Sequence, residues 1–189
     1  MPIPFHEADG TEALGEAGFL KIDHSPAGTH YAGGLLLINA LGEPIEFTYS
    51  RIDVPYETLW RQSDARRFAA RRLAVSLLSL CAKVPIVLLC LDDEVERDLF
   101  ASEVQLSIPV CIVTPAAEDG PPTDISGLDP SETTRAAGLF WISAPPAEAS
   151  RAAQLMRELA LRSLVLEPFE RATRGLREVY TPVAGVETK

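Results

Sequence analysis

The sequence has no long uninterrupted hydrophobic run, and no basic segment followed by an apolar stretch near residue 1. A membrane-spanning helix needs roughly 18 consecutive apolar residues, and a secretory signal needs a charged start followed by an apolar core. We therefore expect a soluble, cytoplasmic protein that has no membrane partner.

Cysteine and histidine are both scarce, with three residues of each. Cys81, Cys90 and Cys111 lie in apolar segments without C-x-x-C spacing, so we expect buried, reduced thiols. A disulfide between Cys90 and Cys111 on adjacent strands is the alternative, and it would require an oxidising compartment. His24 and His30 are too few for a zinc site, which usually takes four ligands, and we expect them to form hydrogen bonds in a loop.

Basic residues are also few, because 17 lysines and arginines stand against 27 acids and leave a net charge of −10. Such a chain repels phosphate, so the composition argues against a nucleic-acid partner unless a local basic patch exists. Glycine-rich phosphate loops (G-x-x-x-x-G-K-[ST], G-x-G-x-x-G) and the motifs G-x-S-x-G and H-E-x-x-H are absent as well. Their absence removes the sequence evidence for P-loop, dinucleotide-binding, serine-hydrolase and zinc-protease chemistry.

One dense basic cluster stands out in this acidic chain. Its members are Arg61, Arg66, Arg67, Arg71 and Arg72. The cluster is either a surface that binds anions or nucleic acid, with Arg71 or Arg72 on a phosphate, or a set of partners for carboxylates of this chain or of another subunit. Helical spacing spreads the five around the helix axis, which favours pairing.

The first half of the chain has the pattern of an antiparallel meander. Strands are predicted over residues 19–24, 31–40 and 45–50, and they are joined by short loops. The period of two in the first strand places Asp23 on the same face as Lys21.

After the meander the hydrophobic period changes from two to 3.6. A helix is predicted from about residue 63 to 83, and its apolar residues predict that it is covered on more than one face. A buried strand over 85–91, a helix over 92–100 and another buried strand over 108–113 follow. The remainder reads as a long loop over 115–137, a strand over 139–142 and two apolar-faced helices.

These elements predict one mixed α/β sheet, with the meander and the parallel strands side by side and helices packed on it. Residues 1–16 are expected to be a flexible arm, residues 17–181 a single domain, and residues 182–189 a tail.

Residues 18–114 resemble the ribonuclease H-like superfamily, which includes resolvases, transposases and related nucleases. The resemblance lies in the order of elements, in the stretch IDHSPAGTHYAGGLLL, and in acids after the first and fourth strands. It implies that Asp23 and either Asp92 or Asp93 are the catalytic acids. Such carboxylates, here Asp23 and Asp92, would hold magnesium or manganese and hydrolyse a phosphodiester.

The chain departs from this pattern where the family has a third acid on the first helix. Here that stretch reads ARRFAARR, and an arginine set against the carboxylates would take the place of the metal. Glu57 or acids of the long loop are alternative ligands. Asp93 followed by Glu96 also fits helix capping, and Asp23 before Ser25 fits a turn.

Two functions therefore remain open. The leading interpretation is a non-catalytic binding or interaction module with a degenerate ribonuclease H-like site, no cofactor, and binding residues among Arg71, Arg72, His24 and His30. Because the C-terminal helices have apolar surfaces, we also predict a homo-oligomer; a different protein partner is an alternative. The second interpretation is a metal-dependent nuclease. Both require the first and fourth strands to be neighbours in the sheet.

Overall fold

The computed structural model describes residues 2–4, 14–25, 30–54, 59–115, 137–142 and 144–180. Its strands are β1 (Pro2–Pro4), β2 (Ala17–His24), β3 (His30–Ile38), β4 (Pro44–Asp53), β5 (Val87–Leu91), β6 (Val110–Pro115) and β7 (Ala137–Trp141). Its helices are α1 (Gln62–Leu80), the short π-helix η2 (Leu99–Glu103), α2 (Arg151–Leu161) and α3 (Glu167–Tyr180). None of these described helices is long and apolar enough to span a membrane.

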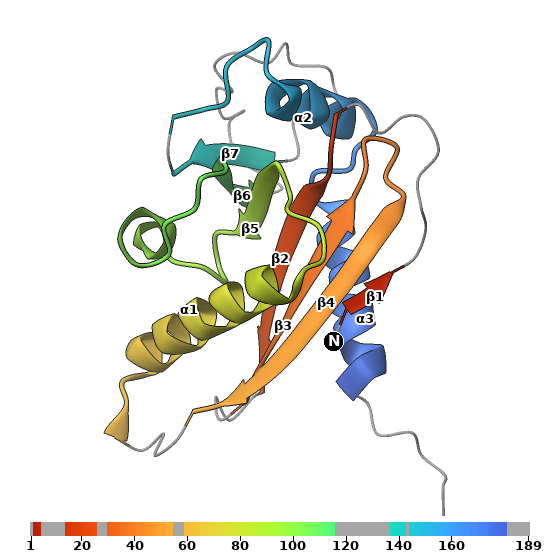
Figure 1. Cartoon of the computed structure of the whole chain (residues 1–189). Helices are drawn as coiled ribbons and strands as arrows, with labels where there is room; N and C mark the ends of the chain where they lie inside the picture. Colours follow the sequence, from red (N-terminus) through yellow and green to blue (C-terminus); the bar gives the residue numbers. More distant parts are fainter. Residues whose placement is uncertain are drawn as a thin grey trace, which may run out of the picture.

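The strands form one mixed sheet in the order β1-β4-β3-β2-β5-β6-β7 (Figure 1). The predicted meander is confirmed, because β2, β3 and β4 pair antiparallel. The two buried apolar runs are confirmed as parallel strands, with β5 between β2 and β6. The first and fourth predicted strands, β2 and β5, are therefore neighbours, as both functional interpretations require.

Helices cover both faces of the sheet (Figure 1). On one face α1 buries Leu73 and Leu77 against Leu20 of β2. On the other face α3 lies across the meander, where Phe169 meets Phe19 edge-on at 5.2 Å between ring centroids. The apolar faces of α2 and α3 are thus used against the sheet, which removes the reason for which the sequence predicted that they pack on a second copy.

Several sequence predictions are wrong in detail. Residues 2–4, placed in a flexible arm, pair with the open edge of β4 as β1. Residues 92–94, placed in a helix, form a turn, and helical geometry begins only at residue 97. All three cysteines are free; Cys90 and Cys111 are buried on neighbouring strands, but they are not register partners, and Cys81 is only partly buried. The long loop and the C-terminal tail lie outside the described residues.

The Phe47 ring of β4 occupies a space that two glycines leave open. A Cβ atom added to Gly175 of α3 would lie 2.8 Å from this ring, and one added to Gly34 of β3 would lie 2.9 Å from it. Contacts this short require the ring or the helix to move. The two glycines therefore let α3 approach the sheet closely.

Replacing Gly175 with alanine is expected to lower the free energy of unfolding by about 1 kcal/mol. Alanine gains about 1 kcal/mol in helix propensity, but overpacking of the Phe47 ring costs roughly 1–3 kcal/mol. Urea denaturation measures the difference. In a Phe47→Leu background the same substitution is expected to stabilise the protein, and a cycle without this change of sign would contradict the steric explanation.

Candidate site at the ends of β2 and β5

Neighbouring residues at the end of β2 face opposite sides of the sheet. Ile22 lies opposite Gly33, where an added Cβ would lie 3.0 Å from Leu77 of α1. Lys21 lies opposite Gly34, where an added Cβ would contact Leu176 of α3. Because side chains alternate along a strand, Asp23 shares the α3 side with Lys21. The position that faces α1 is filled by buried Ile22.

The turn after β5 brings Glu94 back to β2. The pairing of β2 with β5 ends at Leu20 and Cys90. Beyond that point the Ile22 amide donates a hydrogen bond to the Glu94 carboxylate at 2.7 Å, and the Lys21 ammonium forms a salt bridge with the other carboxylate oxygen. The Glu94 carboxylate thus accepts the hydrogen bond of a β2 amide at a position where β5 no longer offers a backbone carbonyl.

The Lys21–Glu94 pair is largely shielded from solvent, because the two side chains are only 17% and 7% exposed. Burial raises the pKa of the Glu94 carboxyl, while the Ile22 amide and the Lys21 ammonium both act to lower it. The carboxylate therefore depends on these two donors to remain charged in a poorly solvated place.

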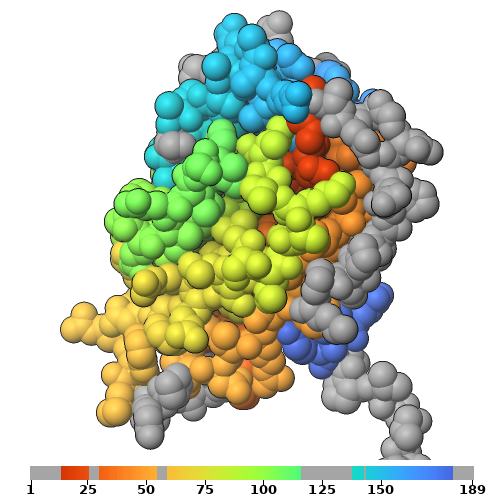
Figure 2. Space-filling view, viewed as in Figure 1, coloured from red at the N-terminus to blue at the C-terminus, as the bar shows by residue number. Residues whose placement is uncertain are grey.

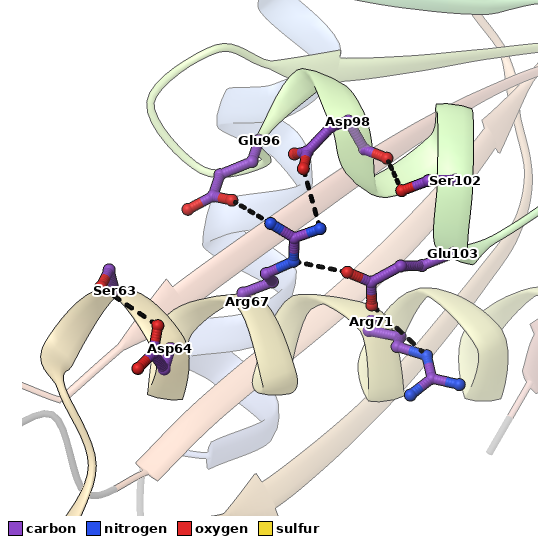
Figure 3. Close-up of polar contacts among 8 residues, drawn as sticks. All are labelled: Ser63, Asp64, Arg67, Arg71, Glu96, Asp98, Ser102 and Glu103. Carbon is purple, nitrogen blue, oxygen red and sulfur yellow. Dashed lines mark hydrogen bonds and ion pairs between the residues drawn. The ribbon is translucent and has the colours of Figure 1, made fainter.

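On the α1 side, Arg67 forms ion pairs with acidic residues of the segment that follows β5 (Figure 3). Its guanidinium contacts Glu96 at 3.3 Å, Asp98 at 2.8 Å and Glu103 at 2.5 Å. Arg71 reaches Glu103 as well, at 3.7 Å. The hydrogen bond that Arg67 donates to the Glu103 carboxylate is the main reason why the pKa of Arg67 is raised. The sequence expectation that these arginines pair with the chain's own carboxylates is confirmed for Arg67 and Arg71.

A small cavity of about 80 Å³ opens between α1 and this turn. This space is large enough to hold a few water molecules. The charged residues that line it are Arg66, Arg67, Asp92, Asp93, Glu94 and Glu96. Asp23 is not among them, so the cavity gathers the acids that follow β5 without the acid of β2.

The predicted catalytic acids Asp23, Asp92 and Asp93 share no hydrogen-bond partner in the part of the chain that the structure describes. Asp92 accepts hydrogen bonds from Arg97 at 3.2 and 3.3 Å and from Thr114 at 3.3 Å. Asp93 is exposed, and the Asp23 carboxylate accepts a hydrogen bond from the His24 amide at 2.8 Å. Within the described ranges, no group of three or more histidines, cysteines or acids is placed to hold a metal ion.

The two predicted histidines make hydrogen bonds at the end of the meander. His24 Nδ1 donates to the Ser25 carbonyl at 3.2 Å, which leaves Nε2 to accept from Arg66 at 2.7 Å. His30 Nδ1 contacts Asp53 at 2.5 Å, and this hydrogen bond is the main reason why the pKa of Asp53 is lowered.

Comparison with known proteins gives a likeness in structure but none in sequence. No family model and no curated protein sequence matches the chain. Endonuclease V from Streptomyces avermitilis superposes with a TM-score of 0.55 and 13% identity over 87% of this chain and 81% of that one. The chain has a ribonuclease H-like fold. Endonuclease V from Bacillus subtilis is also similar, at 13% identity and a TM-score of 0.47 over 88% and 80% of the two chains.

Sequence reasoning missed the two residues that pair where the inner strands β2 and β5 end, Lys21 and Glu94. The strand period placed Lys21 on the same face as Asp23, but its partner is Glu94. A lysine inside a mostly apolar strand was the available signal, because such a charge is seldom buried without a partner. Glu94 follows Asp92 and Asp93 directly, and the wrong helix prediction over 92–100 hid its turn.

Proposed function

We propose that the protein is a non-catalytic binding domain built on a ribonuclease H-like fold. The observation that carries this proposal is the salt bridge between Lys21 and Glu94 where β2 and β5 end. An ammonium group there neutralises a carboxylate that a divalent cation would otherwise use. On the α1 side β2 contributes buried Ile22 in place of an acid. The three free cysteines are compatible with the cytoplasm that we propose as its location.

The second candidate is a metal-dependent phosphodiester hydrolase that uses Asp92 and Asp93 with magnesium or manganese. It is favoured by the likeness in fold to Endonuclease V and by the acids that share a cavity with Arg66 and Arg67. The contacts fit a divalent cation poorly, because Arg97 and Thr114 already engage Asp92. The comparison thus supports the hydrolase more, and the side-chain contacts support the binding domain.

Thermal unfolding with manganese separates the two candidates. A bound cation would stabilise the fold by about 2.7 kcal/mol at a hundredfold excess over its dissociation constant, so the binding domain predicts an unchanged Tm. Cleavage of labelled single- and double-stranded DNA, assayed in the same buffer, is expected to be absent. A Tm increase and a cleavage activity that both vanish in Asp92→Asn, but persist in the surface control Asp64→Asn, would establish the hydrolase instead.

A further inference from the structure

Helix α1 carries most of the arginine cluster, and the fold leaves the outer side of this helix uncovered. Figure 2 shows this helix in yellow at the molecular surface. Val75 is 50% exposed, and Trp60, just before the helix, is 38% exposed. Phe68 lies between them in sequence and contacts the Trp60 ring at 5.1 Å between centroids. The sequence predicts that this helix is covered on more than one face; Phe68 and Leu78 do pack partly against the core, but Val75 is exposed.

Positive charge flanks this apolar strip. At 100° per residue Arg71 and Arg72 lie on the same side of the helix as Phe68 and Val75, together with Asp64, and Arg61 directly precedes the helix. The Arg72 guanidinium lies over the Phe68 ring, 5.8 Å from its centroid. No carboxylate in the described part of the chain forms an ion pair with Arg61 or Arg72, although the whole chain carries a net charge of −10. These cations are available to an acidic ligand.

The distribution of charge selects the occupant. In a two-fold pairing of α1 with a second copy, placing Phe68 against Val75 of the other copy brings Arg71 and Arg72 against arginines. Like charges set against each other in an interface cost several kcal/mol. A negatively charged helix with apolar residues at i, i+3 and i+4 meets both features, since its apolar stripe fits the strip and its carboxylates meet the arginines.

We propose that the outer side of α1, formed by Trp60, Phe68, Arg71, Arg72 and Val75, binds an acidic amphipathic helix of a partner protein. This inference rests on the proposed function, because it names the partner class of the binding domain. Apolar side chains of the partner cover Phe68 and Val75, and its acids pair with Arg72 and with the exposed Arg71, which also contacts Glu103. The mixture of apolar contact and charge makes binding weaken, but not vanish, as salt is raised.

The probe is a fluorescein-labelled peptide with leucines at helical spacing and glutamate elsewhere, titrated with the full chain and followed by anisotropy. The acidic peptide is expected to bind, and the same peptide with lysine in place of each glutamate is not. Arg72→Glu and Val75→Asp are each expected to weaken binding about tenfold or more. Leu161→Asp, at a 63% exposed position on α2, is the matched control and leaves binding unchanged.

Four results would overturn this inference. These are absence of binding by the acidic peptide, equal binding by the lysine peptide, tighter binding of a single-stranded oligonucleotide that Arg72→Glu abolishes, and a dimer in sedimentation that Val75→Asp dissociates. Circular dichroism confirms that each variant is folded. Manganese-dependent cleavage would refute the proposed function while peptide binding persisted, whereas loss of peptide binding without cleavage would refute only the partner.

Discussion

Replacing Lys21 with methionine is expected to lower the free energy of unfolding at pH 7 by about 3 kcal/mol. Removal of one partner leaves the Glu94 carboxylate, whose side chain is 7% exposed, without its cation. An uncompensated charge in a poorly solvated site typically costs roughly 3–5 kcal/mol, and the partial exposure of Lys21 places this pair at the low end. Urea denaturation of the variant measures the loss.

The pH dependence of this loss identifies Glu94 as its cause. Burial already raises the pKa of Glu94 above the ordinary 4.5, and loss of Lys21 raises it further. The folded variant then holds a proton that the unfolded chain releases as the pH rises above 4.5, so its stability falls over that range. Below pH 4.5 both states are protonated. We therefore expect the difference between the variant and the wild type to be smaller at pH 4 than at pH 7.

A double variant and a surface control complete this test. Adding Glu94→Gln to Lys21→Met removes the buried charge and is expected to recover a large part of the lost stability. Lys83→Met, which breaks the more exposed pair with Glu16, is expected to cost at most about 1 kcal/mol. If Lys21→Met costs no more than Lys83→Met at pH 7, the central role of the buried pair is refuted.

Replacing Glu46 with alanine is expected to lower the free energy of unfolding by about 2 kcal/mol. Glu46 is a buried acid of β4, and its carboxylate accepts hydrogen bonds from the Ala82 amide at 2.9 Å and the Lys83 amide at 3.2 Å, just after α1 ends. The Thr48 hydroxyl donates to it at 3.2 Å. Each buried donor left without an acceptor costs roughly 1–3 kcal/mol, and entry of water at exposed Ala82 limits the total.

Thermal unfolding compares this variant with two others. Glu46→Gln keeps the shape and one acceptor oxygen, so it is expected to cost less than alanine. Glu170→Ala, at an exposed position of α3, controls for the loss of one negative charge and is expected to change stability by about 0.5 kcal/mol or less. An equal effect of Glu46→Ala and Glu170→Ala would show that the amides after α1 find other acceptors.

Hydrophobic period was sufficient to predict most of the fold. The alternation in residues 19–24 and 45–50 and the continuous apolar run over 85–91 predicted the strands correctly, because side-chain direction along a strand follows from local geometry. It also predicted that Lys21 and Asp23 share a face. Hydrophobic periodicity could not predict that β1 pairs with β4, because three residues are too few to show a period. Such a short strand forms only where the open edge of another strand lies beside it.

The candidate site was less predictable, because its contacts join residues far apart in the chain. The resemblance drew attention to Asp23, but the alternation that predicts a strand also turns Asp23 away from the side of α1. The sequence pointed to Asp92 and Asp93 after β5, but it missed Glu94, which pairs with Lys21. The partners of these acids were not predicted, since the choice among Lys21, Arg67 and Arg97 depends on how the turn after β5 folds.

The sequence by itself determined the mixed sheet and the presence of acids where β5 ends, whereas the adjacency of β2 and β5 was a requirement of the resemblance that the structure confirmed. The first two depend on which residues avoid water and on the backbone geometry of strands. Only the tertiary structure decided that Glu94 closes the end of β2 with Lys21, that Arg67 gathers the acids of the next segment, and that the outer side of α1 stays uncovered. A charged side chain takes the partner that packing brings within reach, and sequence spacing alone does not fix that choice.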